Sequence, residues 1–583
     1  MDLRDDFQLV VAIDFGTTYT GYAYSTRHEF KADPIQIHLM NWNAGSAGLV
    51  SQKAPTCVLF KPDQSFDSFG FEAEDNYNEL ALDDKHGAWF FFRRFKMELY
   101  KDHLDRNKTL KTEDGKEMKA IKVVSSVISY LKDHMTKTIK DRAIDIRETE
   151  IRWVVTVPAI WSDPAKQMMR EAAETAGIAG NQLLIALEPE AASMLCKHMP
   201  GSLLLSGDRA DKLESFRVGC RYMVLDAGGG TIDITVHEVA SGGSLKEIYE
   251  ANGGDWGGTK VDESFENLLK TIVGEPAFSH FKANDVPSVI DLQRNFEVKK
   301  RTFTGKDTGN KTTITVPCSL LESFKECNPD KHIKDAIQER FLPEDVAWNR
   351  DKIRLSLTKA HSMFEPSLKH ISEHVSEILH IAEVQKCEAI LLVGGYSECP
   401  LLQDSIRSVV GNRRLIIPNG AGLAVLKGAV INGHRPDTLS QRICKYTYGI
   451  SLNFPFGEDG YDKYRYVNND GDVKCGHCFK IFVNKGSHVS IGESSVTREV
   501  YVGYALAKSI HFSLYASTSE HPKYVTEKSC QRLGGITLDM PDTTLGKARG
   551  ANATIYFGGS EIKLTAEDKH TGEKISACFD FLG

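Results

Sequence analysis

The sequence predicts an α/β protein with two lobes, followed by a separate β-rich domain. Three observations support this. The 583 residues are too many for one hydrophobic core. Short apolar runs bounded by Gly, Pro or Asp recur through the first 433 residues, with amphipathic helical patterns between them, as in mainly parallel sheets. After about Gly433 the pattern changes to short alternating runs separated by turn residues.

Four runs in the first part predict buried strands, at 9–13, 154–157, 223–225 and 390–393. A helix is expected over 162–177, because Ser162 or Asp163 can cap it, Pro164 suits its first turn and Gly177 can end it. A second long helix is expected over about 359–384 from apolar residues at helical spacing.

The β-rich part begins near Tyr446 and is expected to be a β-sandwich. Its last two alternating runs, 562–566 and 575–581, flank the turn sequence "KHTG" and predict a hairpin. The pair "CGHC" at 475–478 has no second Cys pair at zinc-finger spacing, so we expect two reduced surface cysteines there.

Composition and charge exclude several classes of protein. A content of 41% hydrophobic and 26% charged residues is that of an ordinary globular protein. No apolar run approaches the roughly 20 residues of a membrane helix. The net charge of -8 disfavours binding to nucleic acid. The acidic N-terminus and the scattered cysteines predict a cytoplasmic protein.

The stretch "IDFGTTYTG" at 13–21 places one aspartate, two glycines and several hydroxyl residues in a tight turn. It lacks the lysine of a Walker loop. Alone, Asp14 is equally well explained as a turn-starting carboxylate. A second copy of the plan occurs in "LDAGGGTID" at 225–233. Two such hairpins facing each other could hold a polyphosphate with backbone N–H groups and hydroxyls, while the two aspartates hold a hydrated Mg²⁺.

Several motifs in order resemble those of the 70-kDa heat-shock proteins, which are members of the actin-like ATPase superfamily. They are "IDFGTTYTG", "WVVTVPAIWSDPAKQ", "LEPEAAS", "LDAGGGTIDIT", "KKRTFTG" and "LLVGGYSECPLLQDSI". The chain is most similar to the divergent heat shock 70 kDa protein 12 subfamily, and the resemblance extends into the β-rich tail. It implies a two-lobed actin-like (ribonuclease H-like) ATPase domain and a peptide-binding β-sandwich.

The resemblance also implies catalytic roles. Asp14 and Asp226 match the carboxylates near Mg²⁺, which they would hold through water. Glu188 matches the acid that orients the attacking water, although before Pro189 it could also be a simple helix start. Lys96 in "RRFKMEL" is the candidate for the lysine that reaches the γ-phosphate. Thr231 belongs to the second phosphate hairpin.

Further residues are expected to contact ATP or ADP. They are Gly16, Thr17, Thr18 and Tyr19 in the first hairpin, Gly228, Gly229, Gly230 and Thr231 in the second, Gly257 and Gly258, then Glu297, Lys300, Arg301 and Thr304 around adenine and ribose, and Gly394 and Gly395 in the opposite wall. Without the resemblance, the basic run at 299–301 would be a solvated helix face.

The sequence departs from the family pattern at three places. Glu398 in "GGYSE" stands where an arginine usually covers the adenine, and Gly422 stands where an aspartate is usual. A nucleotide is therefore expected to sit differently or to bind less tightly. The linker "GHRPDTLSQRICK" has one leucine, which does not support ordinary ATP-driven coupling. The sequence ends at Gly583, and neither a helical lid nor an "EEVD"-type tail is expected.

We therefore expect an actin-like domain over 9–433, with lobes 9–220 and 221–433, a linker over 434–445, and a lidless substrate-binding-like β-sandwich over 446–583. The expected function is that of a chaperone-like stress protein that binds ATP with Mg²⁺, hydrolyses it slowly, and binds protein or peptide clients. Nucleotide-exchange or adaptor partners are expected, but no nucleic acid and no membrane span. A nucleotide-gated adaptor with little hydrolysis is the alternative, and a small-molecule kinase of the same fold is less favoured.

Overall fold

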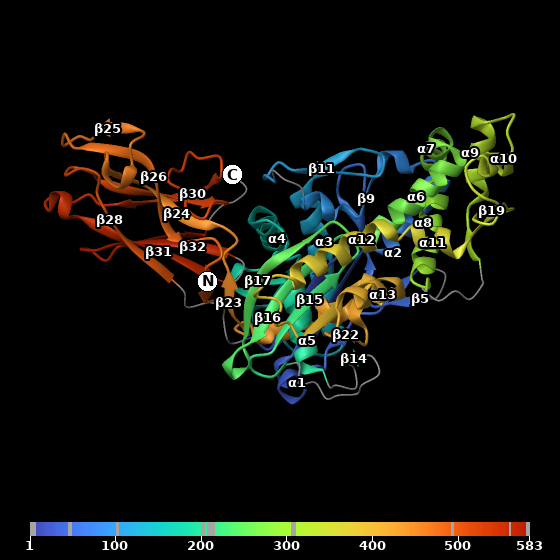
Figure 1. Cartoon of the computed structure of the whole chain (residues 1–583), viewed down its shortest axis with the longest axis horizontal. Helices are drawn as coiled ribbons and strands as arrows, with labels where there is room; N and C mark the ends of the chain where they lie inside the picture. Colours follow the sequence, from blue (N-terminus) through green and yellow to red (C-terminus); the bar gives the residue numbers. More distant parts are fainter. Residues whose placement is uncertain are drawn as a thin grey trace.

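The chain is described by a computed structural model for residues 7–44, 49–100, 104–199, 204–206, 216–304, 311–490, 495–558 and 561–578. Figure 1 shows two lobes of mixed strands and helices, with the β-rich C-terminal region beside them. Within these ranges no helix is both long and apolar enough to cross a membrane.

The two lobes are built on sheets of related topology. In each sheet three neighbouring strands are parallel, and the last of them forms an antiparallel hairpin with the next strand. These hairpins are β1 (Leu9–Phe15) with β2 (Tyr19–Thr26) in the first lobe, and β15 (Arg221–Ala227) with β16 (Ile232–Val239) in the second. The first sheet consists, in spatial order, of β13 (Leu183–Leu187), β12 (Ile151–Val157), β1 (Leu9–Phe15), β2 (Tyr19–Thr26) and β3 (His38–Leu39), with β6 (Ala54–Pro55) also paired to β2. The second consists of β14 (Leu204–Ser206), β22 (Arg414–Pro418), β21 (Ala389–Val393), β15 (Arg221–Ala227), β16 (Ile232–Val239), β17 (Leu245–Gly254), β23 (Leu439–Ile443) and β27 (His488–Ser490). The repeated sequence plan is therefore a repeated fold.

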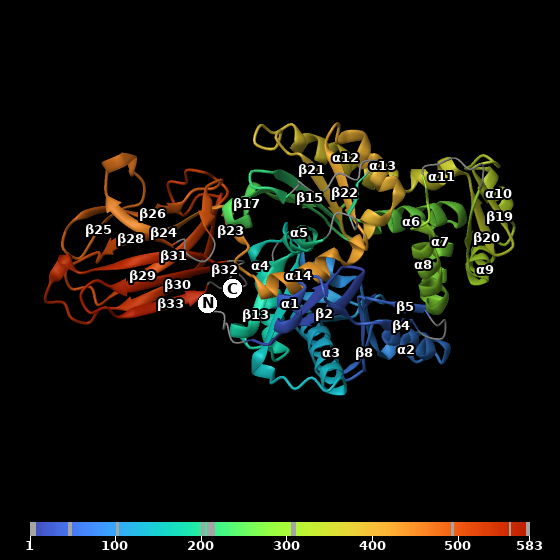
Figure 2. The ribbon, with the colours of Figure 1, turned by 90° about the horizontal axis from the view of Figure 1, so that it is seen from below.

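Two helices, α5 (Glu188–His198) and α14 (Ala424–His434), lie between the two sheets (Figure 2). Ala191 and Leu426 pack against the first sheet, and Ala192 and Val425 pack against the second. The outer faces are covered by α3 (Ala120–Asp141) and α4 (Asp163–Thr175) on the first lobe and by α12 (Glu365–Leu379) and α13 (Pro400–Val409) on the second.

The expected strands and the helix expected over 162–177 are confirmed, but the single helix over 359–384 is wrong. The chain forms α11 (Leu357–Ser362) and α12, with a break at Met363 and Phe364. Pro366 lies in the first turn of α12, where its missing N–H costs nothing. In one continuous helix the same proline would remove an internal hydrogen bond, and this explains the break.

Further elements complete the two lobes. The first lobe adds α1 (Arg27–Ala32), β4 (Trp42–Ala44), β5 (Leu49–Ser51), β7 (Cys57–Phe60), β8 (Phe66–Phe69), α2 (Phe71–Leu82), β9 (Phe90–Arg93), β10 (Thr109–Lys111) and β11 (Glu117–Lys119). The second adds α6 (Thr259–Val273), α7 (Glu275–Asn284), α8 (Val286–Lys300), β18 (Thr312–Thr315), α9 (Cys318–Cys327), α10 (Ile333–Gln338), β19 (Val346–Asn349) and β20 (Lys352–Leu355).

The C-terminal region contains two antiparallel sheets that share one hydrophobic core. Ile450, Phe512 and Leu514 of one sheet and Ile555 and Leu564 of the other are all buried in it. The first sheet is β25 (Arg465–Val467), β26 (Val473–Val483), β24 (Thr447–Pro455), β29 (Ser509–Ser517) and β30 (Cys530–Asp539), and the second is β28 (Ser495–Tyr501), β31 (Gly550–Gly558), β32 (Glu561–Asp568) and β33 (Lys574–Cys578). The hairpin expected at the end is β32–β33, although 579–581 lie outside the described residues.

The cysteines of "CGHC" are buried, so the expectation of surface cysteines is wrong. Cys475 and Cys478 lie on β26 with no exposed side-chain area and contact Tyr524. Both thiols are free, and burial raises the pKa of Cys478 to about 12, so that it is a poor nucleophile and a poor metal ligand. Among the described residues no group of His, Cys, Asp and Glu side chains could hold a metal ion directly.

The segment expected to be a linker contributes a strand to the second lobe. β23 pairs in parallel with β17 and antiparallel with β27, which belongs to the C-terminal region. Arg442 in β23 forms a bidentate ion pair with Glu190, at 2.6 and 3.1 Å. The Ile443 N–H donates to Glu247 on β17 at 2.8 Å. The connection between the lobes and the C-terminal region is thus fixed by buried polar contacts.

Removing Arg442 should destabilise the protein, because Glu190 is only 7% exposed and would lose its partner. We expect Arg442→Ala to lower the free energy of unfolding by about 3–5 kcal/mol, measured by urea unfolding at neutral pH. Arg407→Ala, which removes an exposed i,i+3 pair with Asp404, is the control and should cost about 0.5 kcal/mol or less. Equal losses in the two variants would contradict a structural role for the Arg442 pair.

The stability should also depend on pH through Glu247. Burial raises its pKa to about 7, although the Ile443 N–H opposes this. A carboxyl whose pKa is higher in the folded than in the unfolded state stabilises the fold fully at pH values below its unfolded-state pKa. This contribution is lost as the pH rises through 7. Between pH 5 and 8 the free energy of unfolding of wild type should fall by about 2–3 kcal/mol more than that of Glu247→Gln. Parallel pH profiles of urea unfolding for the two proteins would refute the assignment.

Candidate functional site

The turns of β1–β2 and β15–β16 touch each other between the lobes. A Cβ atom added to Gly229 would lie 2.4 Å from the Thr18 Oγ1, and one added to Gly230 would lie 2.6 Å from the Thr17 Oγ1. Real side chains do not approach so closely, so no larger residue fits here without a shift. The structure thus brings together the two hairpins that the sequence singled out, with N–H groups and hydroxyls on both sides.

The second hairpin is held by the residues that begin α6. The N–H groups of Gly257 and Gly258 donate to the carbonyls of Gly230 and Gly228, each at 3.1 Å, and the Thr259 N–H donates to the Gly229 carbonyl at 2.8 Å. Gly257 and Gly258 therefore lie beside the second hairpin, and their N–H groups hold its carbonyls; their contact with nucleotide stays a prediction.

Asp14 and Asp226 are the next-to-last residues of β1 and β15 and are each 4% exposed. Asp14 accepts hydrogen bonds from the Thr156 Oγ1 at 2.9 Å and from the Lys53 Nζ at 2.6 Å. Burial raises the pKa of Asp226 well above its usual range, and the nearby carboxylates Glu188, Asp233 and Asp14 raise it further. A cluster of acidic oxygens beside glycine hairpins fits a hydrated Mg²⁺ that carries phosphate.

Lys96 and Glu188 form a buried ion pair within this cluster. The Lys96 Nζ lies 2.6 Å from the Glu188 Oε1, and the lysine is 2% exposed. Its ammonium also lies 5.2 Å from the centre of the Trp161 ring, a cation–π distance. Burial raises the pKa of Glu188 to about 7, although Lys96 acts in the opposite direction. The two residues assigned to the γ-phosphate and to the attacking water are therefore neighbours.

Asp233 is part of the site and was not predicted. It is fully buried, its Oδ1 accepts from the Ile160 N–H at 3.0 Å, and Thr231 donates a side-chain hydrogen bond to it. Asp233 is the cross-strand partner of Asp226 in β15–β16, and its carboxylate raises the pKa of Glu188 and of Asp226. Its position in "GGGTID", two residues after Thr231, was the available signal.

The expected adenine and ribose residues are grouped at the end of α8. The Lys300 Nζ contacts Asp262 at 2.7 Å and Glu297 at 2.5 Å, and the Arg301 guanidinium contacts Glu297 at 2.9 Å. Arg301 also lies 5.7 Å from the centre of the Tyr19 ring. Burial alone would raise the pKa of Glu297, but the charges of Lys300 and Arg301 lower it to about 2. Tyr19, Glu297, Lys300 and Arg301 thus form one charged cluster.

Thr304 follows this cluster and is exposed, and its carbonyl accepts from the His361 Nε2 at 3.0 Å. The opposite wall is formed by Gly394 and Gly395, which follow β21. Gly394 has φ +87°, and a Cβ there would lie 2.3 Å from the Asp226 Oδ1. Glycine is thus required at this position, because its φ is positive and because a side chain would collide with Asp226.

Two of the departures from the family pattern meet in the structure. The Gly422 N–H donates to the Glu398 Oε1 at 3.3 Å, and the Gly422 carbonyl accepts from the Lys53 Nζ at 2.8 Å. Burial disfavours the charged Arg301 guanidinium, but Glu297, Tyr19 and Glu398 together raise its pKa. Glu398 is therefore close enough to influence Arg301 electrostatically, from the opposite wall.

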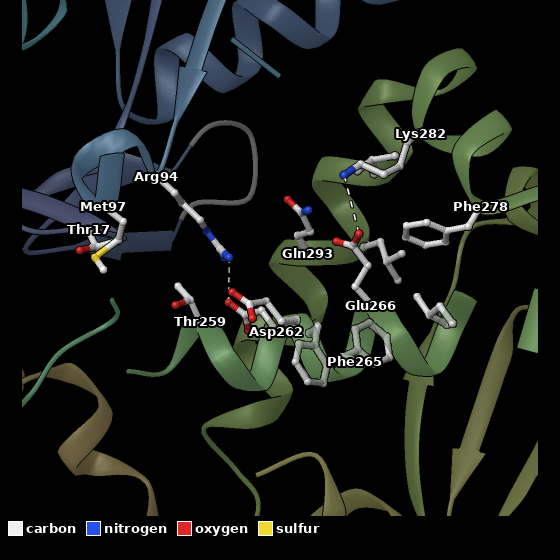
Figure 3. A pocket seen from close by; sticks show the side chains of 15 residues that line it. Thr17, Arg94, Met97, Thr259, Asp262, Phe265, Glu266, Phe278, Lys282 and Gln293 are labelled. Carbon is white, nitrogen blue, oxygen red and sulfur yellow. Dashed lines mark ion pairs between the residues drawn. The ribbon is translucent and has the colours of Figure 1, made fainter. Parts of the chain in front are cut away.

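A cavity of about 240 Å³ lies beside the hairpins (Figure 3). Thr17, Arg94 and Met97 of the first lobe and α6, α7 and α8 of the second lobe line it. Arg94 points across it to Asp262, with 2.9 Å between the Nη1 and Oδ2 atoms. Among the predicted site residues it contains Thr17 only, so it adjoins the phosphate hairpins without including the adenine cluster.

Comparisons with known proteins find similar sequences in one family. A sequence model described as Hsp70 protein matches residues 91–315. Heat shock 70 kDa protein 12B of Homo sapiens is 33% identical over 638 residues, covering 99% of this chain and 91% of that protein. Heat shock 70 kDa protein 12A of Mus musculus is 33% identical over 631 residues, covering 99% and 92%. Chaperone protein DnaK of Mycoplasma mobile is 25% identical over 354 residues, covering 60% and 51%.

The adjacent glycines Gly394 and Gly395 allow a matched test of the site geometry. Gly394→Ala should lower the free energy of unfolding by about 1–3 kcal/mol or more, because an alanine is strained at φ +87° and would displace Asp226. Gly395→Ala should lower it by about 1 kcal/mol or less, since no atom of the residues that the structure describes lies within 4 Å of the added Cβ. Urea unfolding measures both, and a larger effect at Gly395 would show that the wall is built differently.

Proposed function

Because the chain belongs to the 70-kDa heat-shock protein family, within the heat shock 70 kDa protein 12 subfamily, we propose that it is a chaperone-like protein that binds ATP and ADP with Mg²⁺ between its lobes. In this proposal hydrolysis is slow, and the C-terminal region binds peptide or protein clients. A cytoplasmic location is part of the same proposal.

The observation that carries the proposal is the pair of touching hairpins with four carboxylates around them. Thr17 and Thr18 face Gly229 and Gly230 across the cleft. Phosphate oxygens need several N–H and hydroxyl donors, and small residues allow the backbone to come close to them. Without a cation, these acidic residues would repel a bound phosphate. Their presence therefore favours a divalent cation as part of the ligand.

The residue roles follow from positions in this cluster. Asp14 and Asp226 would hold Mg²⁺ through its water molecules. Lys96 would contact the γ-phosphate, and Glu188 would orient the attacking water. Thr231 would contact phosphate from the second hairpin while it also bonds Asp233. Attack of water on a phosphoryl group needs mainly positioning and charge stabilisation, so these contacts would account for most of the rate.

The proposed domains are the two lobes over 9–433 and a β-sandwich over 446–583, and the shared core of the C-terminal sheets supports the latter. Residues 434–445 would join them. Since Arg442 binds Glu190, two residues after Glu188, we propose that this segment couples the C-terminal region to the site. Nucleotide-exchange or adaptor proteins remain proposed partners.

A nucleotide-gated adaptor is the second candidate, and the Lys96–Glu188 pair is the observation that favours it. A carboxylate whose oxygen is held by an ammonium at 2.6 Å has an acceptor position already occupied, and it is less free to orient water. If nucleotide binding leaves this pair intact, ATP would be bound with little hydrolysis.

Single-turnover hydrolysis of Mg·ATP separates the two candidates. We expect a slow but measurable rate in wild type and a rate lower by about 100-fold or more in Glu188→Gln. Glu377→Gln, which changes an exposed carboxylate on α12, is the control and should match wild type. Equal and negligible rates in wild type and Glu188→Gln would overturn the hydrolysis and favour the adaptor.

A further inference from the structure

Lys53 places a positive charge between the two lobes at the candidate metal site. Its Nζ lies 2.6 Å from the Asp14 Oδ2 on the first lobe and 2.8 Å from the Gly422 carbonyl oxygen on the second. The side chain is only 16% exposed. Two of its three N–H donors are thus used by protein atoms of opposite lobes, in the part of the chain that the structure describes, and a third is left for another acceptor.

The surrounding chain is shaped to admit this side chain. Lys53 lies between β5 and β6, next to β2, and Gly21 on β2 pairs with Asp14 on β1. A Cβ at Gly21 would lie 3.0 Å from the Lys53 Cγ and 3.0 Å from the Gln52 carbonyl oxygen. The absent side chain of Gly21 therefore lets the lysine stem cross β2 and reach the carboxylate. The contact is built into the first phosphate hairpin itself.

The charge of Lys53 compensates a local excess of carboxylates. Lys96 neutralises Glu188, and Asp233 accepts from the Ile160 N–H. Lys53 is the ammonium beside Asp14, and it also acts to lower the pKa of Asp226 against burial and the surrounding carboxylates. The other end of its contact is Gly422, where the family pattern has an aspartate. Here a lysine and a carbonyl replace a further negative charge.

We propose that Lys53 is a resident cation of the cleft, which weakens the binding of a hydrated Mg²⁺ beside Asp14 and supplies an N–H donor to the phosphate chain. This inference rests on the proposed nucleotide binding. An ammonium next to Asp14 repels a divalent cation and attracts phosphate. The chain should therefore bind nucleotide with less dependence on Mg²⁺ than two aspartates alone would impose.

The proposal is tested with Lys53→Met, which keeps most of the side-chain length and removes the charge. Lys53→Arg keeps the charge, and Lys85→Met removes an exposed lysine that pairs with Asp83 as a control. The first measurement is thermal unfolding without nucleotide, in EDTA and in excess MgCl₂ at constant ionic strength. The second is the calorimetric Kd for ADP under the same two conditions.

We expect Mg²⁺ to raise the Tm of Lys53→Met clearly more than that of wild type, Lys53→Arg or Lys85→Met. The ratio of the Kd in EDTA to the Kd in MgCl₂ should increase by about tenfold or more in Lys53→Met relative to wild type. The reason is that removal of the ammonium weakens Mg-free binding and strengthens Mg²⁺ binding.

An unchanged Mg²⁺ response of the Tm, together with an unchanged Kd ratio, would overturn the proposal and leave Lys53 as a plain contact between lobes. If wild type binds no ADP under either condition, the proposed function fails. The nucleotide-free Tm measurement then still decides the role of Lys53.

Discussion

The contact between the two glycine-containing hairpins is the constraint on which the rest of the structure depends. Gly229 and Gly230 lie against Thr18 and Thr17 at distances that leave no room for a side chain. This approach is possible because α5 and α14 hold the two sheets apart at one fixed spacing, and because the start of α6 binds the carbonyls of the second hairpin. The catalytic candidates Asp14, Asp226, Lys96 and Glu188 all lie at strand or helix ends that this packing brings together.

Several contacts between the lobes are ionic. Besides Lys53, which bonds Asp14 and Gly422, Arg94 binds Asp262 at 2.9 Å and the Arg294 Nε donates to the Glu74 Oε2 at 2.8 Å. A ligand that enters the cleft with phosphate and Mg²⁺ competes with such pairs directly. Nucleotide could therefore shift the lobes only by as much as its own contacts exceed those that it replaces. The Lys96–Glu188 pair and the contacts of Lys53 are therefore among the interactions that nucleotide binding must replace or compensate.

Much of the fold could be predicted from the sequence, because the repeated plan of strand, Asp, glycines and strand is local. The resemblance assigned site roles to residues in the two hairpins and in "LEPEAAS"; the structure brings the hairpins together and pairs Glu188 with Lys96, while the roles themselves stay predictions. Lys53 had no local signal, since its partners Asp14 and Gly422 are distant in sequence. The break before Pro366 was missed because helical periodicity continues across it, and the buried position of Cys475 and Cys478 depends on the packing of Tyr524. β23 was read as a linker because its pairing with β17 is non-local.

The central claim is that a phosphate chain is held between the two hairpins. A crystal structure of the chain with ADP and Mg²⁺ tests it most directly. The account predicts that the two hairpins separate on binding, with density for the phosphates between Thr17–Thr18 and Gly228–Gly230. Asp14 and Asp226 should lie near the Mg²⁺ and Arg301 beside the base. A nucleotide bound elsewhere, or an empty cleft at saturating ADP, would contradict it.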